Sequence, residues 1–400
     1  MSKSSGHETQ SDYLDSPYTP GVTASFTPGR ERQLTRMERA LVRVAGQGKF
    51  EGRISVLQGA RGVGKTSVLR AAERKANALG VTSVFVTAGT GSVLDVVVAR
   101  LAEIAADEPH VSALVARLRE SVSRLTIGVG PIGVELAVGD EPPAPAGSLV
   151  HDLKRLVAQA ARMPERANRG LLLVIDEVQD MPPLEIRVLA TAWQELQAET
   201  QNPDEPRLPA VVFAAGLGDV HEAITHGASF GERFHFESLA NLSDESAALA
   251  VIEPANELGV SWSVDALNQL LELAGGYPYF VQLYADEAWN NANRVAGGEI
   301  RSEDVAEGAE VADEQVRAFY RGRWSKATDA EKRLLVALAE TGGDKAPRAE
   351  IAETMGVPSS DLSVARAALV AKGILIAPRR GVLAFSAPGF GRFILDETQG

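Results

Sequence analysis

The segment Gly59–Thr66, GARGVGKT, constrains this chain more than any other. It matches the pattern G-x-x-x-x-G-K-[S/T] in full, with an apolar, strand-like run before it (Ile54–Gln58) and a helical pattern after it (Lys65–Leu79). In such a context, glycines let backbone N–H groups close around phosphate oxygens, and the helix N-terminus adds a favourable dipole. The sequence therefore predicts a P-loop that binds ATP, or alternatively GTP, together with Mg²⁺.

Individual roles within the loop follow from the chemistry of its side chains. Lys65 can reach the β- and γ-phosphates, and the Thr66 hydroxyl can ligate Mg²⁺. The remaining predicted nucleotide-contacting residues are Gly59, Ala60, Arg61, Gly62, Val63, Gly64 and Ser67. A chance match in a glycine-rich chain is the alternative, and the flanking strand and helix argue against it.

The segment LLLVIDE, Leu171–Glu177, supplies the expected second half of such a site. A buried apolar strand would bring Asp176 to its C-terminal end, where it can hold Mg²⁺ through water. Glu177 would then polarise the attacking water as general base, which predicts ATP hydrolysis. The alternative is an ordinary buried strand that ends in acids, and its position downstream of a P-loop favours the functional interpretation.

Strands and helices alternate through the first 240 residues. The strand-like runs are apolar throughout, which is typical of a parallel sheet covered on both faces, so we expect an α/β domain. The predicted strands are Ile54–Gln58, Thr82–Thr87, Leu171–Ile175 and Ala210–Ala215. A hairpin over Ile127–Val138 and a Pro-rich loop at 141–147 interrupt the pattern.

The strand pattern stops at Ser243, and helices follow. Those predicted for a helical subdomain are Ser243–Glu257, Val264–Ala274, Tyr279–Val295 and Ser302–Tyr320. Three more helices come next, at Thr328–Glu340, Arg348–Met355 and Ser359–Lys372, and then two short strands around Arg379-Arg380-Gly381. Three helices and a β-hairpin predict a winged helix-turn-helix. The predicted domains are a disordered N-terminal arm (1–25), an ATPase domain (26–240), a helical lid (241–322) and the winged helix (323–400).

Charge and composition limit the partners. The 400-residue chain has a net charge of −13, which argues against a protein that coats nucleic acid over its whole surface. Residues 321–395 nevertheless hold twelve Lys/Arg against seven Asp/Glu, a local net of +5. There is no cysteine, which excludes disulfides and thiol chemistry. Apolar runs are too short for a membrane span and the N-terminus lacks a signal-peptide core, so we expect a cytoplasmic protein without a membrane partner.

The segment FTPGRERQL, Phe26–Leu34, together with the two nucleotide motifs, resembles the AAA+ and STAND P-loop ATPases over about residues 26–320. The resemblance implies that Arg30 and Glu31 lie near adenine, although the segment could also be a capped helix start. It implies further that Arg233, in ERFHFESL before the last strand, is an arginine finger that reaches the nucleotide of a neighbouring subunit. The alternative for Arg233 is a surface or packing residue.

Two departures from the AAA+ pattern matter for function. The lid segment AGGYPYFVQ, 274–282, resembles the G-x-P element of STAND and archaeal-type ATPases, which places Pro278 near the nucleotide. AAA+ initiators usually have an arginine there, whereas this chain has Tyr277 and Pro278. Gly216 stands where a polar sensor residue is usual after the fourth strand. These departures favour a switch-like ATPase over a processive motor.

The architecture resembles that of the origin-recognition initiators. This resemblance implies that the protein forms a nucleotide-dependent homo-oligomer and binds duplex DNA through its winged helix. Arg366 and Lys372 lie on or at the end of the third helix, which would enter the major groove, and Arg379 and Arg380 would contact phosphates from the wing. The alternative is a signalling STAND ATPase whose winged helix is autoinhibitory or docks a protein, without DNA binding.

Overall fold

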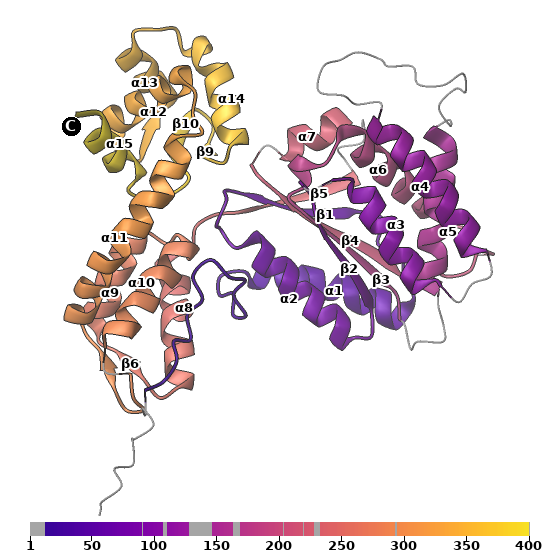
Figure 1. Cartoon of the computed structure of the whole chain (residues 1–400), viewed down its shortest axis with the longest axis horizontal. Coiled ribbons are helices and arrows are strands. Elements are labelled where there is room, and N and C mark those ends of the chain that lie inside the picture. The colour runs from indigo at the N-terminus through magenta and orange to yellow at the C-terminus, as the bar shows by residue number, and fades with distance from the viewer. Residues whose placement is uncertain are drawn as a thin grey trace, which may run out of the picture. The chain divides into compact units, whose positions relative to one another are not determined.

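The computed structural model describes residues 13–89, 91–106, 110–127, 146–162, 169–202, 204–218, 220–227, 233–292 and 294–399. The hairpin predicted over Ile127–Val138 lies outside these residues, except that Ile127 ends a helix. The described chain forms two compact units (Figure 1). The sheet unit comprises Arg30–Gly59 and Lys65–Leu239, and the helical unit comprises Met1–Gly29, Ala60–Gly64 and Ala240–Gly400.

A five-stranded parallel sheet with the order β2-β3-β4-β1-β5 is the centre of the sheet unit. Every residue of β3 and β4 is buried, because these central strands carry apolar side chains on both faces. This confirms the predicted α/β fold with its parallel sheet. The strands are β1 (Ile54–Gly59), β2 (Thr82–Thr87), β3 (Leu171–Asp176), β4 (Ala210–Gly216) and β5 (Phe234–Leu239).

Helices cover both faces of this sheet (Figure 1). One face carries α1 (Glu31–Gln47) and α2 (Lys65–Ala78), and the other face carries α3 (Val93–Ile104), α5 (Ala146–Arg162) and α6 (Pro183–Glu199). The unit also contains α4 (Val111–Ile127), the 3₁₀ turn η1 (Val178–Asp180) and α7 (Val220–Gly227). Of these, η1 and α7 were not expected from the sequence.

The strand order places the P-loop at a favourable edge. β1 lies between β4 and β5, which is the point where the strand order reverses. In open parallel sheets, ligands bind outside the carboxyl ends of the strands at such a switch point. Gly59 ends β1 at this edge, and Asp176 ends β3 at the same edge.

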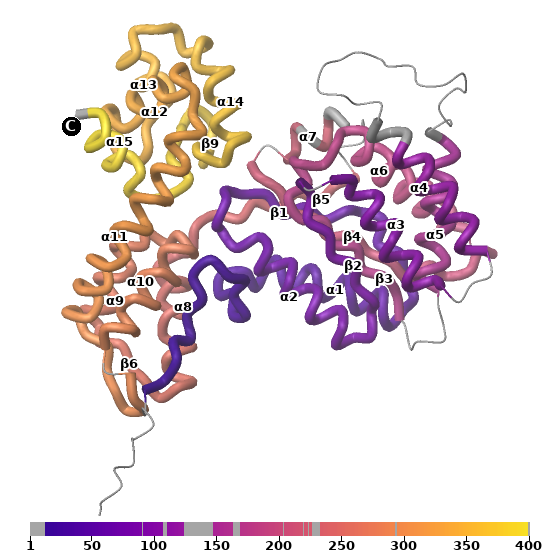
Figure 2. Tube along the Cα trace, viewed as in Figure 1, coloured from indigo at the N-terminus to yellow at the C-terminus, as the bar shows by residue number. Residues whose placement is uncertain are grey.

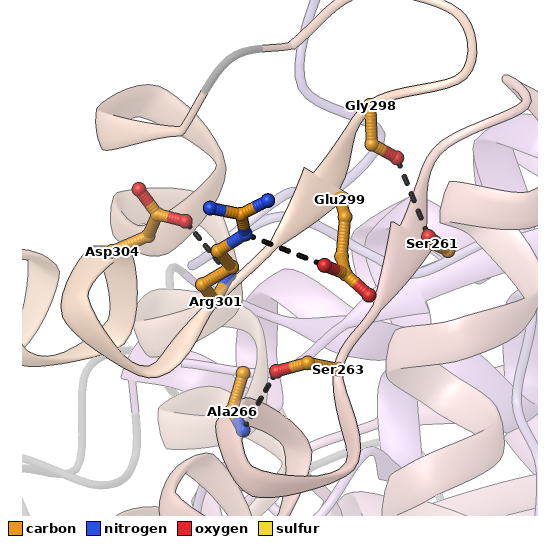
Figure 3. A network of polar contacts seen from close by, with 7 residues as sticks. All are labelled: Ser261, Ser263, Ala266, Gly298, Glu299, Arg301 and Asp304. Atoms are coloured by element: carbon orange, nitrogen blue, oxygen red, sulfur yellow. Dashed lines mark hydrogen bonds and ion pairs between the residues drawn. The ribbon is translucent and has the colours of Figure 1, made fainter.

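The helical unit begins with four lid helices, α8 (Asp244–Glu257), α9 (Val264–Ala274), α10 (Pro278–Asn291) and α11 (Ser302–Trp324). They agree with the predicted helices, and Ser243 caps α8 by accepting from the Ser246 N–H. A two-residue parallel ladder, β6 (Ser261–Trp262) with β7 (Glu299–Ile300), was not predicted because strands this short leave no periodicity to detect. Figure 3 shows the polar contacts around this ladder: Ser263 caps α9, and Asp304 accepts from the Arg301 N–H at 2.7 Å.

The N-terminal segment runs beside α8 (Figure 2), so disorder over residues 1–25 is a wrong expectation for residues 13–25. Tyr18 is buried, and its hydroxyl donates to the Val251 carbonyl at 2.7 Å and accepts from Trp262 Nε1 at 2.9 Å. Its ring meets Trp262 and Trp289 edge-on. The buried Tyr18 side chain thus anchors this polar segment on the helical unit, although the composition of the segment alone does not suggest an ordered structure.

The C-terminal part of the helical unit contains the predicted three helices and hairpin. Its helices are α12 (Asp329–Gly342), α13 (Arg348–Met355), η3 (Ser359–Leu362), α14 (Ser363–Ala371) and α15 (Phe390–Gln399). Its antiparallel sheet has the order β8-β10-β9, from β8 (Lys345–Pro347), β9 (Leu375–Arg379) and β10 (Val382–Phe385). β8 and α15 were not predicted. The winged-helix assignment and the four-part domain division stay predictions.

Candidate nucleotide-binding and hydrolysis site

The P-loop backbone has the conformation that its glycines permit. Gly62 has φ 85° and Gly64 has φ 92°, values that L side chains rarely adopt. Lys65 starts α2 directly after the loop, and the residue is only 5% exposed. Its Nζ donates to the Gly59 carbonyl at 3.1 Å, which holds the ammonium group against the loop. Such a buried charge beside backbone N–H groups suits a phosphate ligand.

A hydrogen bond brings the side-chain oxygen atoms of Thr66 and Asp176 together. The Thr66 hydroxyl donates to Asp176 Oδ2 at 2.6 Å, and Asp176 Oδ1 accepts from the Glu177 N–H at 3.0 Å. Burial raises the pKa of Asp176, and the hydrogen bond from Thr66 partly opposes that shift. Hard oxygen atoms of this kind suit Mg²⁺, which typically uses one or two carboxylates and takes its other ligands from phosphate and water.

The residues present therefore fit Mg²⁺, with Thr66 and Asp176 as the groups that would hold it. When bound, Mg²⁺ would neutralise charge on the phosphates. Among the residues that the structure describes, no cluster of three or more His, Asp or Glu side chains forms a separate metal site.

Glu177 has an unusual backbone conformation. With φ 56° and ψ 43°, it is the one non-glycine residue with positive φ in the described part of the chain. A non-glycine residue in this region costs about 1–3 kcal/mol, and such strain clusters at functional sites. The Glu177 carboxylate accepts from Gln179 Nε2 at 2.7 Å. The sequence analysis did not single out Gln179. The available signal was that a polar residue stands two positions after the predicted base.

A second contact missed from the sequence lies within the helical unit, which includes P-loop residues 60–64. The Tyr277 hydroxyl donates to the Arg61 carbonyl and accepts from an Arg323 NH2 group at 3.1 Å. A Cβ atom on Gly62 would overlap the Tyr277 hydroxyl, so this approach requires glycine. Arg323 also lies 3.6 Å over the Phe319 ring, and burial, together with the charge of Arg61, lowers the pKa of Arg323.

The residues predicted to lie near adenine occupy defined positions. Arg30 precedes α1 and is 7% exposed, and burial lowers its pKa; Glu31 is exposed in the first turn. Pro278 is the first residue of α10, directly after Tyr277. Their contact with a nucleotide base stays a prediction.

Arg233 lies at the opposite edge of the sheet from the P-loop. It directly precedes β5, whose first residue Phe234 pairs with Ile54 at the start of β1, whereas Leu239 pairs with Gly59 at the end. The five steps from Phe234 to Leu239, at about 3.3 Å each, separate the two edges by roughly 17 Å. Arg233 lines a small cavity with Trp193, and its action at a nucleotide stays a prediction.

The four residues predicted to contact DNA differ in their surroundings. Arg379 ends β9 and Arg380 forms the turn with Gly381, and both arginines are exposed. Arg366 is half-buried on α14, and its Nε has no hydrogen-bond partner among the described residues. Lys372, by contrast, donates to the Glu331 carboxylate at 2.6 Å and to the Lys326 carbonyl at 2.9 Å. A DNA contact by Lys372 would have to break this ion pair.

A glycine-rich loop at a strand switch point, a lysine that opens the next helix, and a Thr–Asp pair beside a carboxylate define a P-loop nucleoside triphosphatase. Residues 27–203 match the family model described as the AAA ATPase domain. Together with the site geometry, this match supports an ATPase domain over this part of the chain, with ATP hydrolysis as its activity. Residues 317–394 match a domain of unknown function, DUF8462. Among curated proteins, none matches this sequence.

Solved structures agree with this fold. The chain is similar to a Walker-type ATPase of Pyrococcus abyssi, at 13% identity and a TM-score of 0.56, over 92% of this chain and 95% of that one. It is similar to the same degree to the ORC2 protein of Aeropyrum pernix in its ADPNP and ADP complexes, at 12% identity and a TM-score of 0.56. That match covers 94% of this chain and 97% of the other. In the described part of this chain, no helix is long and apolar enough to span a membrane.

Proposed function

We propose that this protein is a nucleotide-operated switch, in which ATP binding and hydrolysis at the P-loop set the position of the C-terminal domain. The proposal rests on the two hydrogen bonds of the Tyr277 hydroxyl, one to the Arg61 carbonyl in the P-loop and one from Arg323. Arg323 lies one residue before the end of α11, the helix that leads into the C-terminal elements. A change in the P-loop on nucleotide exchange therefore has a direct hydrogen-bonded route to that helix.

The hydrolytic roles follow from the site. The backbone N–H groups of residues 60–66 and the Lys65 ammonium bind and orient the phosphates. The Glu177 carboxylate accepts a proton from water as the water oxygen attacks the γ-phosphorus, and the bond to the bridging oxygen breaks to give ADP and phosphate. Arg30, Glu31 and Pro278 complete the site as proposed base and lid contacts.

Two substitutions test this assignment. Lys65→Ala removes the charge that pairs with the β- and γ-phosphates, so tight ATP binding measured by calorimetry should be lost.

Glu177→Gln keeps the size of the side chain and removes the base, so ATP should bind while phosphate release slows by about 10²–10⁴-fold. Unchanged ATP affinity in folded Lys65→Ala, or parental turnover in Glu177→Gln, would show that another group performs the role.

The proposed output is duplex DNA. Arg379 and Arg380 project from the β9–β10 turn, where phosphate contact from a wing is expected, and the region 321–395 has a net charge of +5. A nucleotide-dependent homo-oligomer in the cytoplasm, with Arg233 acting at a neighbouring subunit, belongs to the same proposal. The position of Arg233 at the sheet edge away from its own P-loop supports action between subunits.

One observation favours the alternative, a signalling switch that docks a protein. The helix α14 has the sequence SVARAALVA with one arginine, and Val364 on it is 82% exposed. Lys372 at its end is paired with Glu331. An apolar exposed helix suits a protein surface better than a major groove. Salt-dependent binding to duplex DNA separates the two outputs.

A further inference from the structure

Gln179 uses both ends of its side-chain amide within the sheet unit. Its Nε2 donates to Glu177 Oε2 at 2.7 Å, and its Oε1 accepts from the Leu217 N–H at 3.0 Å. The amide orientation is set by chemistry, because a carboxylate only accepts and a backbone N–H only donates. The side chain therefore ties the proposed base to the residue that follows β4.

The sheet register brings these groups together. Ile175 pairs with Ala214, and β3 and β4 then end at Asp176 and Gly216, so Glu177 and Leu217 both follow their strands at the same carboxyl edge. A Cβ atom on Gly216 would lie 2.9 Å from Gln179 Oε1 and would also crowd Val220 at the start of α7. Position 216 thus has to be glycine for the Gln179 amide to lie there. This is the position where the AAA+ resemblance leads one to expect a polar side chain.

We propose that Gln179 is the positioning residue of the hydrolytic site and supplies from η1 the polar group that β4 lacks. The amide holds one carboxylate oxygen of Glu177, which leaves the other oxygen for the attacking water. Leu217 in turn holds the amide, so a shift at the end of β4 would move the base. This inference rests on the proposed role of Glu177 as general base.

The decisive variant is Gln179→Glu, because it separates two roles of one side chain. An ionised glutamate at this position can still accept from the Leu217 N–H, so the tether between η1 and β4 survives. It cannot donate to Glu177, and it adds a negative charge beside Glu177 and Asp180, the two carboxylates that Gln179 Nε2 contacts in the parent. If Gln179 positions Glu177, Gln179→Glu should lose activity as Gln179→Ala does. Parental activity of Gln179→Glu, despite its added charge, would show that only the tether matters.

We expect both variants to lower kcat by about 10–100-fold, because small displacements of a reacting group have effects of this size. ATP affinity, measured by calorimetry, should stay within about twofold of the parent, since Gln179 contacts no P-loop residue in the described structure. Gln201→Ala is the matched control, because Gln201 is an exposed glutamine after α6. Thermal unfolding of each variant excludes misfolding as the cause.

The pH dependence gives a readout that a tether alone would not change. Relative to the parent, Gln179→Glu should regain activity as the pH falls toward about 5, because a protonated carboxyl group donates a hydrogen bond again. In the Glu177→Gln background, Gln179→Ala should cause no further loss, since Gln179 acts through Glu177.

Parental or higher kcat in folded Gln179→Ala, or parental kcat and pH profile in Gln179→Glu, would overturn the inference. A full additional loss from Gln179→Ala in the Glu177→Gln background would overturn it as well. The proposed function fails in a different way, namely if the parent does not hydrolyse ATP or if Glu177→Gln alone has no effect.

Discussion

At the scale of one residue, Asp176 shows how a functional group can lower the free energy of unfolding. It is 3% exposed at the end of β3, and burial, the main cause, raises its pKa above the ordinary value of 3.8. A carboxyl group whose pKa is higher in the folded chain than in the unfolded chain favours the folded state when protonated. Its contribution is therefore lost as the pH rises from about 3.8 through the raised pKa.

Asp176→Asn should for this reason be more stable than the parent near neutral pH. Its amide can still accept from the Glu177 N–H and can donate to the Thr66 oxygen, so the fold keeps both contacts. Urea unfolding at about pH 8 and about pH 4 should show a stability difference that shrinks in acid. Mg²⁺-dependent ATP hydrolysis should be lost in the same variant. An Asn variant that is less stable than the parent at neutral pH would contradict this account.

At the scale of elements, α10 and α11 meet at the Tyr277 hydroxyl. Tyr277 is the residue directly before α10 and is fully buried, and Arg323 lies in the last turn of α11. Aromatic contacts surround the pair, with Phe280 and Phe319 at 5.0 Å and 5.8 Å from the Tyr277 ring. The ring thus belongs to the lid core, and the hydroxyl alone connects it to the P-loop carbonyl and the guanidinium.

Tyr277→Phe keeps this ring and removes the hydroxyl. Leaving a buried acceptor and a guanidinium without this partner should destabilise the protein by about 1–3 kcal/mol in urea unfolding. Limited proteolysis around residues 325–328 should also lose its dependence on ATP, because the route from the P-loop to α11 is broken. Tyr279→Phe is the control, since Tyr279 lies on the same helix and stacks on Phe319 at 5.5 Å. Equal effects of the two changes would exclude a specific role for the Tyr277 hydroxyl.

At the scale of the whole molecule, the proposed DNA output rests on two arginines in a chain of net charge −13. If the β9–β10 turn is a DNA wing, Arg379 and Arg380 neutralise about two phosphates. Replacing both with Ala should then flatten the slope of log K against log[salt] by roughly 1.8 units on any duplex sequence. ATPase activity should not change, since both residues lie outside the P-loop.

The matched control replaces Arg333 and Arg392, two exposed arginines of the same C-terminal region, and changes the net charge equally. Its salt slope should stay close to that of the parent. Absence of salt-sensitive duplex binding by the parent, with either ATP or ADP, would favour the signalling switch and its exposed α14 surface.

The sequence by itself determined the elements whose signals are local. The run GARGVGKT specified the P-loop between a strand and a helix, and the apolar runs around Leu171–Ile175 and Ala210–Ala215 specified buried parallel strands, both of which the structure contains. Glycine conformation and side-chain hydrophobicity act within a few residues, so a single sequence records them. Two-residue strands and the Tyr18 anchor left no such periodic signal.

Only the tertiary structure decided which polar groups meet. Gln179 reaches Leu217 across 38 positions of sequence, Tyr277 reaches Arg61 across 216, and Lys372 reaches Glu331 across 41. Hydrogen bonds and ion pairs form between whatever groups folding brings within about 3 Å, and a residue's identity does not name its partner. Folding therefore decided that Lys372 forms an internal ion pair with Glu331 and that Gln179 donates a hydrogen bond to Glu177.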